Sequence, residues 1–166
     1  MGDFEPNMMT KKAWALAILF IVGLTGCATM QGTVGVAPLP NDTNIIPPSP
    51  DLPKNIAGFS GKWVGNWIHR TGNNQEIILV VEEVWDKSAR ILYSWGVNPN
   101  AIHSSAGYFR QTSQITSDTK PKIHVIFRHS GLNAIIFELE DSNTLVGSIE
   151  SWSGFVTAKV ILKKAN

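Results

Sequence analysis

Residues 56–166 alternate between short runs rich in Val, Ile, Phe, Trp and Thr and shorter stretches of Gly, Asn, Asp and Ser. Runs of β-branched and aromatic residues bounded by turn-forming residues are typical of β-strands. No segment of this region has the periodicity of an amphipathic helix. The pattern predicts eight strands, over residues 59–69, 76–85, 90–97, 106–116, 122–129, 134–140, 144–150 and 155–163.

Alternation within these strands separates an inner face from an outer face, because successive side chains of a strand point to opposite sides. The inner face of the first strand is predicted to carry Phe59, Gly61, Trp63, Gly65 and Trp67. The inner face of the third is predicted to carry Ile91, Tyr93, Trp95 and Val97. The second strand differs, because residues 77–81 are apolar on both faces. Its outer face therefore needs a cover, from another segment or from partner strands.

Short connections between consecutive strands favour an antiparallel meander, and a flat sheet of eight strands would leave two edges unpaired. Closure removes those edges. The predicted fold class is therefore all-β, an antiparallel up-and-down eight-stranded barrel. A sandwich of two four-stranded sheets is the alternative.

The N-terminal segment has a different pattern. Lys11 and Lys12 precede an apolar run over residues 13–24, which ends in small residues. This order is typical of a cleaved secretory signal, and the run is shorter than the roughly 20 residues that span a bilayer. A retained transmembrane anchor is the alternative. Because Asp3 and Glu5 are unusual in a basic signal, translation could start at Met8 or Met9 instead of Met1.

The end of this segment, Leu24-Thr25-Gly26-Cys27, resembles the lipobox of bacterial lipoproteins, and Cys27 is the only cysteine of the chain. The resemblance implies cleavage before Cys27, a diacylglyceryl group on its thiol and an acyl chain, such as palmitate, on its amine. More than one acyl chain gives stable membrane anchoring. Ala28 in place of Asp implies the outer membrane in such lipoproteins, with the face unassigned. A disulfide between chains or a reactive thiol is the alternative for Cys27.

Six of the nine prolines lie within residues 28–55, which show neither helical nor alternating periodicity. Such a stretch favours extended conformations and is interpreted as a spacer. The chain is therefore divided into a signal peptide over residues 1–26, a lipidated N-terminus with a proline-rich tether over residues 27–55, and a barrel domain over residues 56–166.

The first strand also carries Gly61-Lys62-Trp63, which resembles the Gly-x-Trp opening of the calycins, a group that includes lipocalins, fatty-acid-binding proteins and avidins. Leu145-Val146-Gly147 together with residues 155–162 is similar to the closing hairpin of bacterial lipocalin-like domains. The resemblance implies that Trp63 closes one end of the barrel under a basic residue of the last strand, Lys159 or Lys163. The domain departs from typical lipocalins in its shorter length, its lack of disulfides and the absence of a clear helix beside the barrel.

The net charge and the candidate catalytic or metal-binding residues narrow the classes of function that the chain could have. The 14 basic residues against 13 acidic ones leave a net charge of +1, which argues against a nucleic-acid binder. No histidine pair has helical metal-ligand spacing, and neither a Gly-x-Ser-x-Gly motif nor a phosphate loop is present. Glu82 with Glu83, or Glu138 with Glu140, could pair as in a glycosidase, but alternation places Glu138 and Glu140 on an outer face. We predict no enzyme, no cofactor and no metal site; a hydrolase or a hydrolase-accessory domain is the alternative.

Five tryptophans in the barrel domain either fill the core or line a cavity for an apolar ligand. The predicted function is binding of a small apolar or amphipathic ligand by a membrane-anchored envelope lipoprotein. The predicted ligand-binding residues are Trp63, Trp67, Tyr93, Trp95, His69, Asn98 and His103. His69 and His129 are expected to meet near a barrel mouth. The alternative is a non-catalytic envelope or adhesion scaffold with a filled barrel, which binds protein or glycan through its outer surface.

Overall fold

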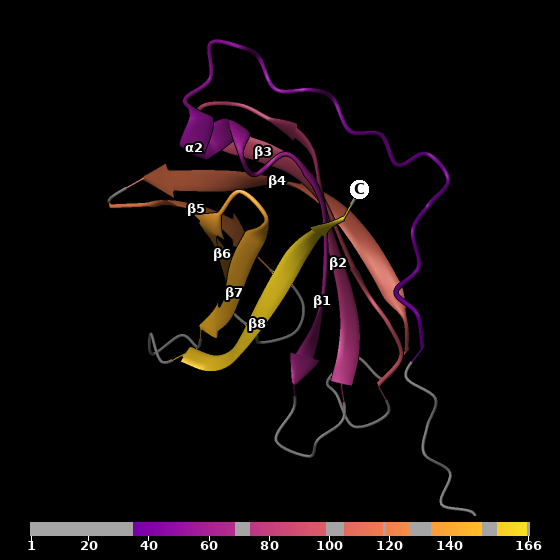
Figure 1. The fold of residues 1–166 in the computed structure, drawn as a ribbon. Coiled ribbons are helices and arrows are strands. Elements are labelled where there is room, and N and C mark those ends of the chain that lie inside the picture. Colours follow the sequence, from indigo (N-terminus) through magenta and orange to yellow (C-terminus); the bar gives the residue numbers. More distant parts are fainter. Residues whose placement is uncertain are drawn as a thin grey trace, which may run out of the picture. The chain divides into compact units, whose positions relative to one another are not determined.

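The computed structural model of the chain describes residues 35–68, 74–98, 105–117, 119–126, 134–150 and 156–165. Its strands form a closed barrel in sequence order, with every neighbouring pair antiparallel (Figure 1). The elements are α2 (Lys54–Ala57), β1 (Gly61–Ile68), β2 (Asn74–Val84), β3 (Ser88–Trp95), β4 (Gly107–Ser117), β5 (Pro121–Val125), β6 (Ala134–Asp141), β7 (Thr144–Glu150) and β8 (Val156–Ala165). The predicted all-β up-and-down barrel is confirmed, and the alternative of a sandwich is wrong.

Closure depends on β1, which pairs with β2 on one side and with β8 on the other. Trp63 lies opposite Leu79 of β2 and opposite Lys164 of β8. Because both edges of β1 are paired, the sheet has no free edge there. The strands follow the predicted ranges to within a few residues, except that β5 ends earlier, at Val125.

The two ends of the barrel differ. One end, which we call the helix end, carries α2 and the turns that join β2 to β3 and β6 to β7. In the described part of the chain α2 has four residues, and no helix there is long and apolar enough to cross a membrane. Strands β1, β3, β5 and β7 run from the helix end to the opposite end, where the chain turns back into the next strand.

Large apolar side chains fill the interior of the barrel, beginning at the helix end. The fully buried large side chains include Phe59, Trp63, Leu79, Phe137 and Leu162, which come from both halves of the barrel. They belong to one continuous hydrophobic core. The alternation-based inner faces of β1 and β3 are confirmed at Trp63, Trp67, Ile91 and Tyr93, all of which are buried.

Residues 35–53, which we call the arm, lie along the outer surface of β2, β3 and β4 (Figure 1, indigo). Ala37, which is 4% exposed, and Leu39 pack against the outward side chains of Ile78, Val80 and Leu92. The cover that the apolar outer face of β2 requires is therefore supplied by the proline-rich segment. The interpretation of that segment as a free spacer is wrong for residues 35–53.

Polar contacts hold the arm in register. The Ala37 N–H donates to the Glu76 carboxylate at 2.7 Å, and the Ile46 N–H donates to the Glu82 carbonyl at 2.7 Å. The Ser94 hydroxyl donates to the carbonyl oxygen of Pro38. Since proline has no N–H, an extended proline-rich chain can satisfy its backbone with few such bonds while it buries apolar side chains.

One arginine joins the arm to the barrel. The Arg110 guanidinium contacts both oxygens of Asp42 in the arm, at 2.8 and 3.0 Å. Its Nε donates to both oxygens of Glu82, at 3.1 and 3.2 Å, and that carboxylate is 4% exposed. The hydrogen bonds from Arg110 hold the pKa of Asp42 below its usual value. Asp42 is therefore expected to stay ionised in the folded protein down to a lower pH than in the unfolded chain, so this contact weakens only as the pH falls through that lowered pKa.

Gly96 makes the close approach of the arm possible. A Cβ at this position would lie 1.8 Å from the carbonyl oxygen of Gly35, which is far inside van der Waals contact. We therefore expect Gly96→Ala to displace the start of the arm, with faster amide hydrogen exchange in peptides that cover residues 35–39. Val36→Ala is the control, because Val36 is 78% exposed. Unchanged exchange in the glycine variant would contradict the docked position of the arm.

Candidate functional site

Aromatic rings gather inside the barrel toward the end opposite α2. Tyr93 lies at the centre: its ring centroid is 5.7 Å from Phe109, 6.1 Å from Trp95 and 6.4 Å from Phe137. The Trp67 indole N–H donates to the Tyr93 hydroxyl at 3.0 Å. We call these five residues the aromatic cluster and the barrel end that they occupy the aromatic end. The tilted ring arrangements are the ones that aromatic pairs favour.

Strand register assembles the cluster. Tyr93 of β3 lies directly opposite Phe109 of β4, and Trp95 lies opposite Gly107. A side chain at Gly107 would collide with the Trp95 indole, since a Cβ there would lie 2.8 Å from the ring. The missing side chain therefore lets the indole lie across β4, where its N–H donates to the Ser105 carbonyl at 2.9 Å.

The residues of the aromatic cluster differ in their exposure to solvent. Trp67 and Tyr93 are buried, at 4% and 3% exposed, whereas Trp95 and Phe109 are only partly buried. Burial raises the pKa of the Tyr93 phenol far above its usual value, and the hydrogen bond from Trp67 lowers it by less. The phenol is therefore neutral, and the cluster presents partly exposed, uncharged aromatic surface beside a buried aromatic floor.

Trp63 lies apart from the cluster, although sequence analysis groups it with Trp67, Tyr93 and Trp95. It precedes Trp67 by four residues on β1, which corresponds to roughly 13 Å along the strand. It is fully buried near the helix end, where its indole N–H donates to the Phe59 carbonyl at 2.8 Å. Its surroundings are those of a core residue that closes this end of the barrel.

The basic residue over Trp63 is Lys164, whose Nζ lies 5.0 Å from the ring centroid. The prediction of Lys159 or Lys163 is wrong. Lys164 is directly opposite Trp63 in the β1–β8 register, so the two side chains share the inner face. Lys163 points the other way and donates to the Thr144 hydroxyl at 2.7 Å. The prediction ended the last strand at residue 163, one residue short of the inward lysine.

The remaining predicted ligand-binding residues are polar. Asn98, three residues beyond the end of β3, is 1% exposed. His69 and His103 lie outside the described residues, as do His129 and one of the five tryptophans of the barrel domain, Trp152. Of the predicted set, the structure brings together Trp67, Tyr93 and Trp95. Sequence analysis missed Phe109 and Phe137; alternation in their strands puts both on an inner face, but only register shows that they meet Tyr93.

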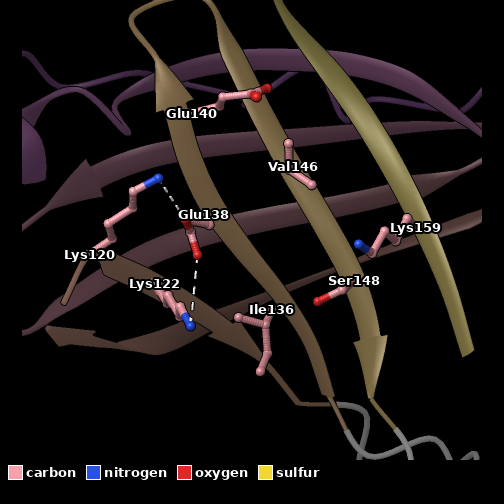
Figure 2. A pocket seen from close by; sticks show the side chains of 8 residues that line it. All are labelled: Lys120, Lys122, Ile136, Glu138, Glu140, Val146, Ser148 and Lys159. Carbon is pink, nitrogen blue, oxygen red and sulfur yellow. Dashed lines mark ion pairs between the residues drawn. The ribbon is translucent and has the colours of Figure 1, made fainter. Parts of the chain in front are cut away.

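A second feature is a surface depression of about 280 Å³ on the outer face of β5, β6, β7 and β8 (Figure 2). Uncharged side chains form its floor and charged ones surround it: Lys120, Lys122, Ile136, Glu138, Glu140, Val146, Ser148 and Lys159. Glu138 contacts Lys120 at 3.2 Å and Lys122 at 3.7 Å. The predicted outward orientation of Glu138 and Glu140 is confirmed, because the residues that alternate with them along β6, Ile135, Phe137 and Leu139, face the core.

Over residues 35–68, 74–98, 105–117, 119–126, 134–150 and 156–165, no three His, Cys, Asp or Glu side chains are grouped so that they could hold a metal ion. The second carboxylate pair considered in the sequence, Glu82 with Glu83, lies beside Arg90, at 3.6 and 3.2 Å. These contacts, with the one from Arg110, make Glu82 part of an ion-pair network.

Together these features define the class of protein: a closed eight-stranded antiparallel barrel, consistent with a lipocalin-like fold, with a partly exposed aromatic cluster at one end. No protein-family model matches the chain, and no curated protein matches it either.

Proposed function

We propose that the barrel binds a small apolar or amphipathic ligand at its aromatic end. The observation that carries this proposal is the pair of partly exposed rings, Trp95 and Phe109, packed on the buried Tyr93. When an apolar group covers partly exposed aromatic surface on the inner face of a barrel, that surface is removed from water and the free energy of the system falls. The same rings present faces for stacking, which also suits an amphipathic molecule with a planar or acyl part.

The helix end is closed to such a ligand by packed side chains, since Phe59 and Trp63 are fully buried there. Binding is therefore expected next to Trp95 and not next to Trp63. An eight-stranded barrel of this size holds one small ligand at most. The proposal involves no catalytic step and no cofactor.

The binding site is tested with Trp95→Ala. We expect this variant to lose about tenfold or more in affinity for a dansylated undecanoic acid probe, a loss of at least about 1.4 kcal/mol. Fluorescence titration of the purified barrel with its arm measures the affinity, and native mass spectrometry detects any amphiphile that copurifies. Trp85→Ala is the matched control, because Trp85 is 39% exposed and lies at the helix end.

Equal affinities of the two tryptophan variants would contradict the site. The depression of Figure 2 then becomes the better candidate, because Lys159 and Ser148 line it together with apolar floor residues. A glycan or a protein segment bound there would support the scaffold alternative. Ser148→Trp, which fills the floor, would abolish such binding and leave the probe affinity unchanged.

We further propose that the chain is exported and anchored through lipid on Cys27, in the outer membrane. The sequence Leu24-Thr25-Gly26-Cys27 supports this proposal. Two or more acyl chains hold a protein stably on a bilayer, whereas the thiol alone would not.

Anchoring is tested with Cys27→Ala. We expect incorporation of radiolabelled palmitate to fall to background and the protein to leave the membrane fraction. A second variant, Cys27→Ala with Thr29→Cys, restores a thiol outside the lipobox and is also expected to remain unlabelled. Labelling of either variant would contradict the proposal, and sucrose-gradient separation of the two membranes tests the outer-membrane assignment.

A further inference from the structure

The arm meets the barrel at the aromatic end first. The Gly35 N–H donates to the carbonyl oxygen of Val97 at 3.4 Å, and Val97 lies just beyond the end of β3 at the aromatic end. Further along, Ala37 contacts Glu76 near the start of β2, and Ile46 contacts Glu82 near its end. The arm therefore runs from the aromatic end to the helix end, as its path in Figure 1 also shows.

This direction limits how far the aromatic end can be from Cys27. Eight peptide links separate Cys27 from Gly35. A fully extended chain of that length reaches roughly 30 Å. If residues 35–53 were free, the first fixed residue would be in α2 at the helix end, and the reach would be roughly 90 Å. Docking of the arm therefore shortens the tether about threefold and moves its attachment point to the opposite end of the barrel.

Apolar and ionic contacts attach the arm to the barrel. The arm buries Ala37 against an apolar surface, and Arg110 links Asp42 to the buried carboxylate of Glu82. The helix end is farther from the attachment point, because the 11 residues of β2 extend over roughly 36 Å. With the attachment at Gly35, the aromatic end is the end of the barrel nearer to Cys27, and the helix end is the end farther from it.

We propose that the docked arm holds the aromatic end of the barrel toward the membrane, so that the ligand is an amphiphile drawn from the lipid surface that carries the anchor. This inference rests on the proposed lipidation of Cys27 and on ligand binding at the aromatic cluster. The function of the arm is then to orient the barrel. An amphiphile then transfers directly between the bilayer and the rings of Trp95 and Phe109, without crossing bulk water.

Orientation is tested by energy transfer from the barrel to the membrane. The full-length lipidated protein is reconstituted into vesicles of phosphatidylethanolamine and phosphatidylglycerol that contain a rhodamine lipid. Because Cys27 is the only cysteine, Ser105→Cys and Asp86→Cys each add one free thiol for a maleimide donor dye. Both positions are exposed, the first at the aromatic end and the second in the turn between β2 and β3. We expect transfer at residue 105 to be about twofold or more above that at residue 86.

The arm is tested in the same assay. Gly96→Ala combined with Asp42→Asn removes two of its attachments, and we expect the ratio of the two transfer efficiencies to fall toward one. Equal or reversed efficiencies in the protein with an intact arm would overturn the orientation while leaving the anchor in place. A failed anchor is distinguishable, because the protein would then not float with the vesicles and Cys27 itself would react with the dye. A failed binding site appears only in the Trp95→Ala titration.

Discussion

Replacing Trp63 with alanine is expected to lower the free energy of unfolding by about 3 to 5 kcal/mol, the range for large aromatic side chains removed from a core. The side chain is fully buried, its indole N–H bonds to the Phe59 carbonyl, and Lys164 lies over its ring. Alanine would leave a cavity between β1, β2 and β8, the strands that close the barrel. Urea unfolding followed by circular dichroism measures the change.

Two controls separate burial from the other contributions. Trp85→Ala removes the same side chain from a position that is 39% exposed, and a loss below about 1 kcal/mol is expected. Lys164→Met keeps the aliphatic cover of the ring and removes the cation, for which a loss of about 0.5 to 2 kcal/mol is expected. If Trp63→Ala and Trp85→Ala were equally mild, Trp63 would not close the core.

Arg110→Met is expected to lower the free energy of unfolding by more than the loss of an exposed ion pair would, because it removes the closest charged partner of the Glu82 carboxylate. The Glu82 carboxylate is 4% exposed, and without Arg110 its remaining partner is Arg90 at 3.6 Å. The same substitution removes the contact with Asp42 in the arm. We therefore expect two effects together, a lower unfolding free energy and faster hydrogen exchange in the arm.

The matched control is Lys122→Met on β5. Lys122 pairs with Glu138 on the outer surface, where the two side chains are 40% and 34% exposed, and such pairs contribute about 0 to 1 kcal/mol. A double-mutant cycle of Arg110→Met with Asp42→Asn isolates the coupling between arm and barrel. Zero coupling energy with unchanged exchange in the arm would show that the arm is held by its apolar contacts alone.

Strand positions were predictable because they depend on local patterns. Alternation over residues 59–67 and 91–97 placed Trp63, Trp67 and Tyr93 on inner faces, and the structure confirms that these side chains are buried. The apolar outer face of residues 77–81 correctly indicated a missing cover. Neither signal needed information about distant parts of the chain, since a strand's period of two is a property of its own backbone.

The identity of that cover could not be predicted in the same way. The proline-rich segment lacks any periodicity, so nothing in it indicates a partner, and composition alone favours a free spacer. Its docking depends on contacts such as Ala37 with Glu76 and Asp42 with Arg110, which join residues 39 and 68 positions apart. Such contacts become visible only when the barrel has formed the surface that they cover.

The sequence by itself determined the all-β class, the number of strands, the inner faces of β1 and β3 and the need for a cover over β2, and it favoured closure over a sandwich. Tertiary structure alone decided that residues 35–53 form this cover, that Lys164 and not Lys159 or Lys163 lies over Trp63, and that Phe109 and Phe137 join Tyr93 in one cluster. The physical reason is that side-chain alternation is encoded within each strand. Which side chains then meet depends on register between strands, and a shift of one residue reverses every face.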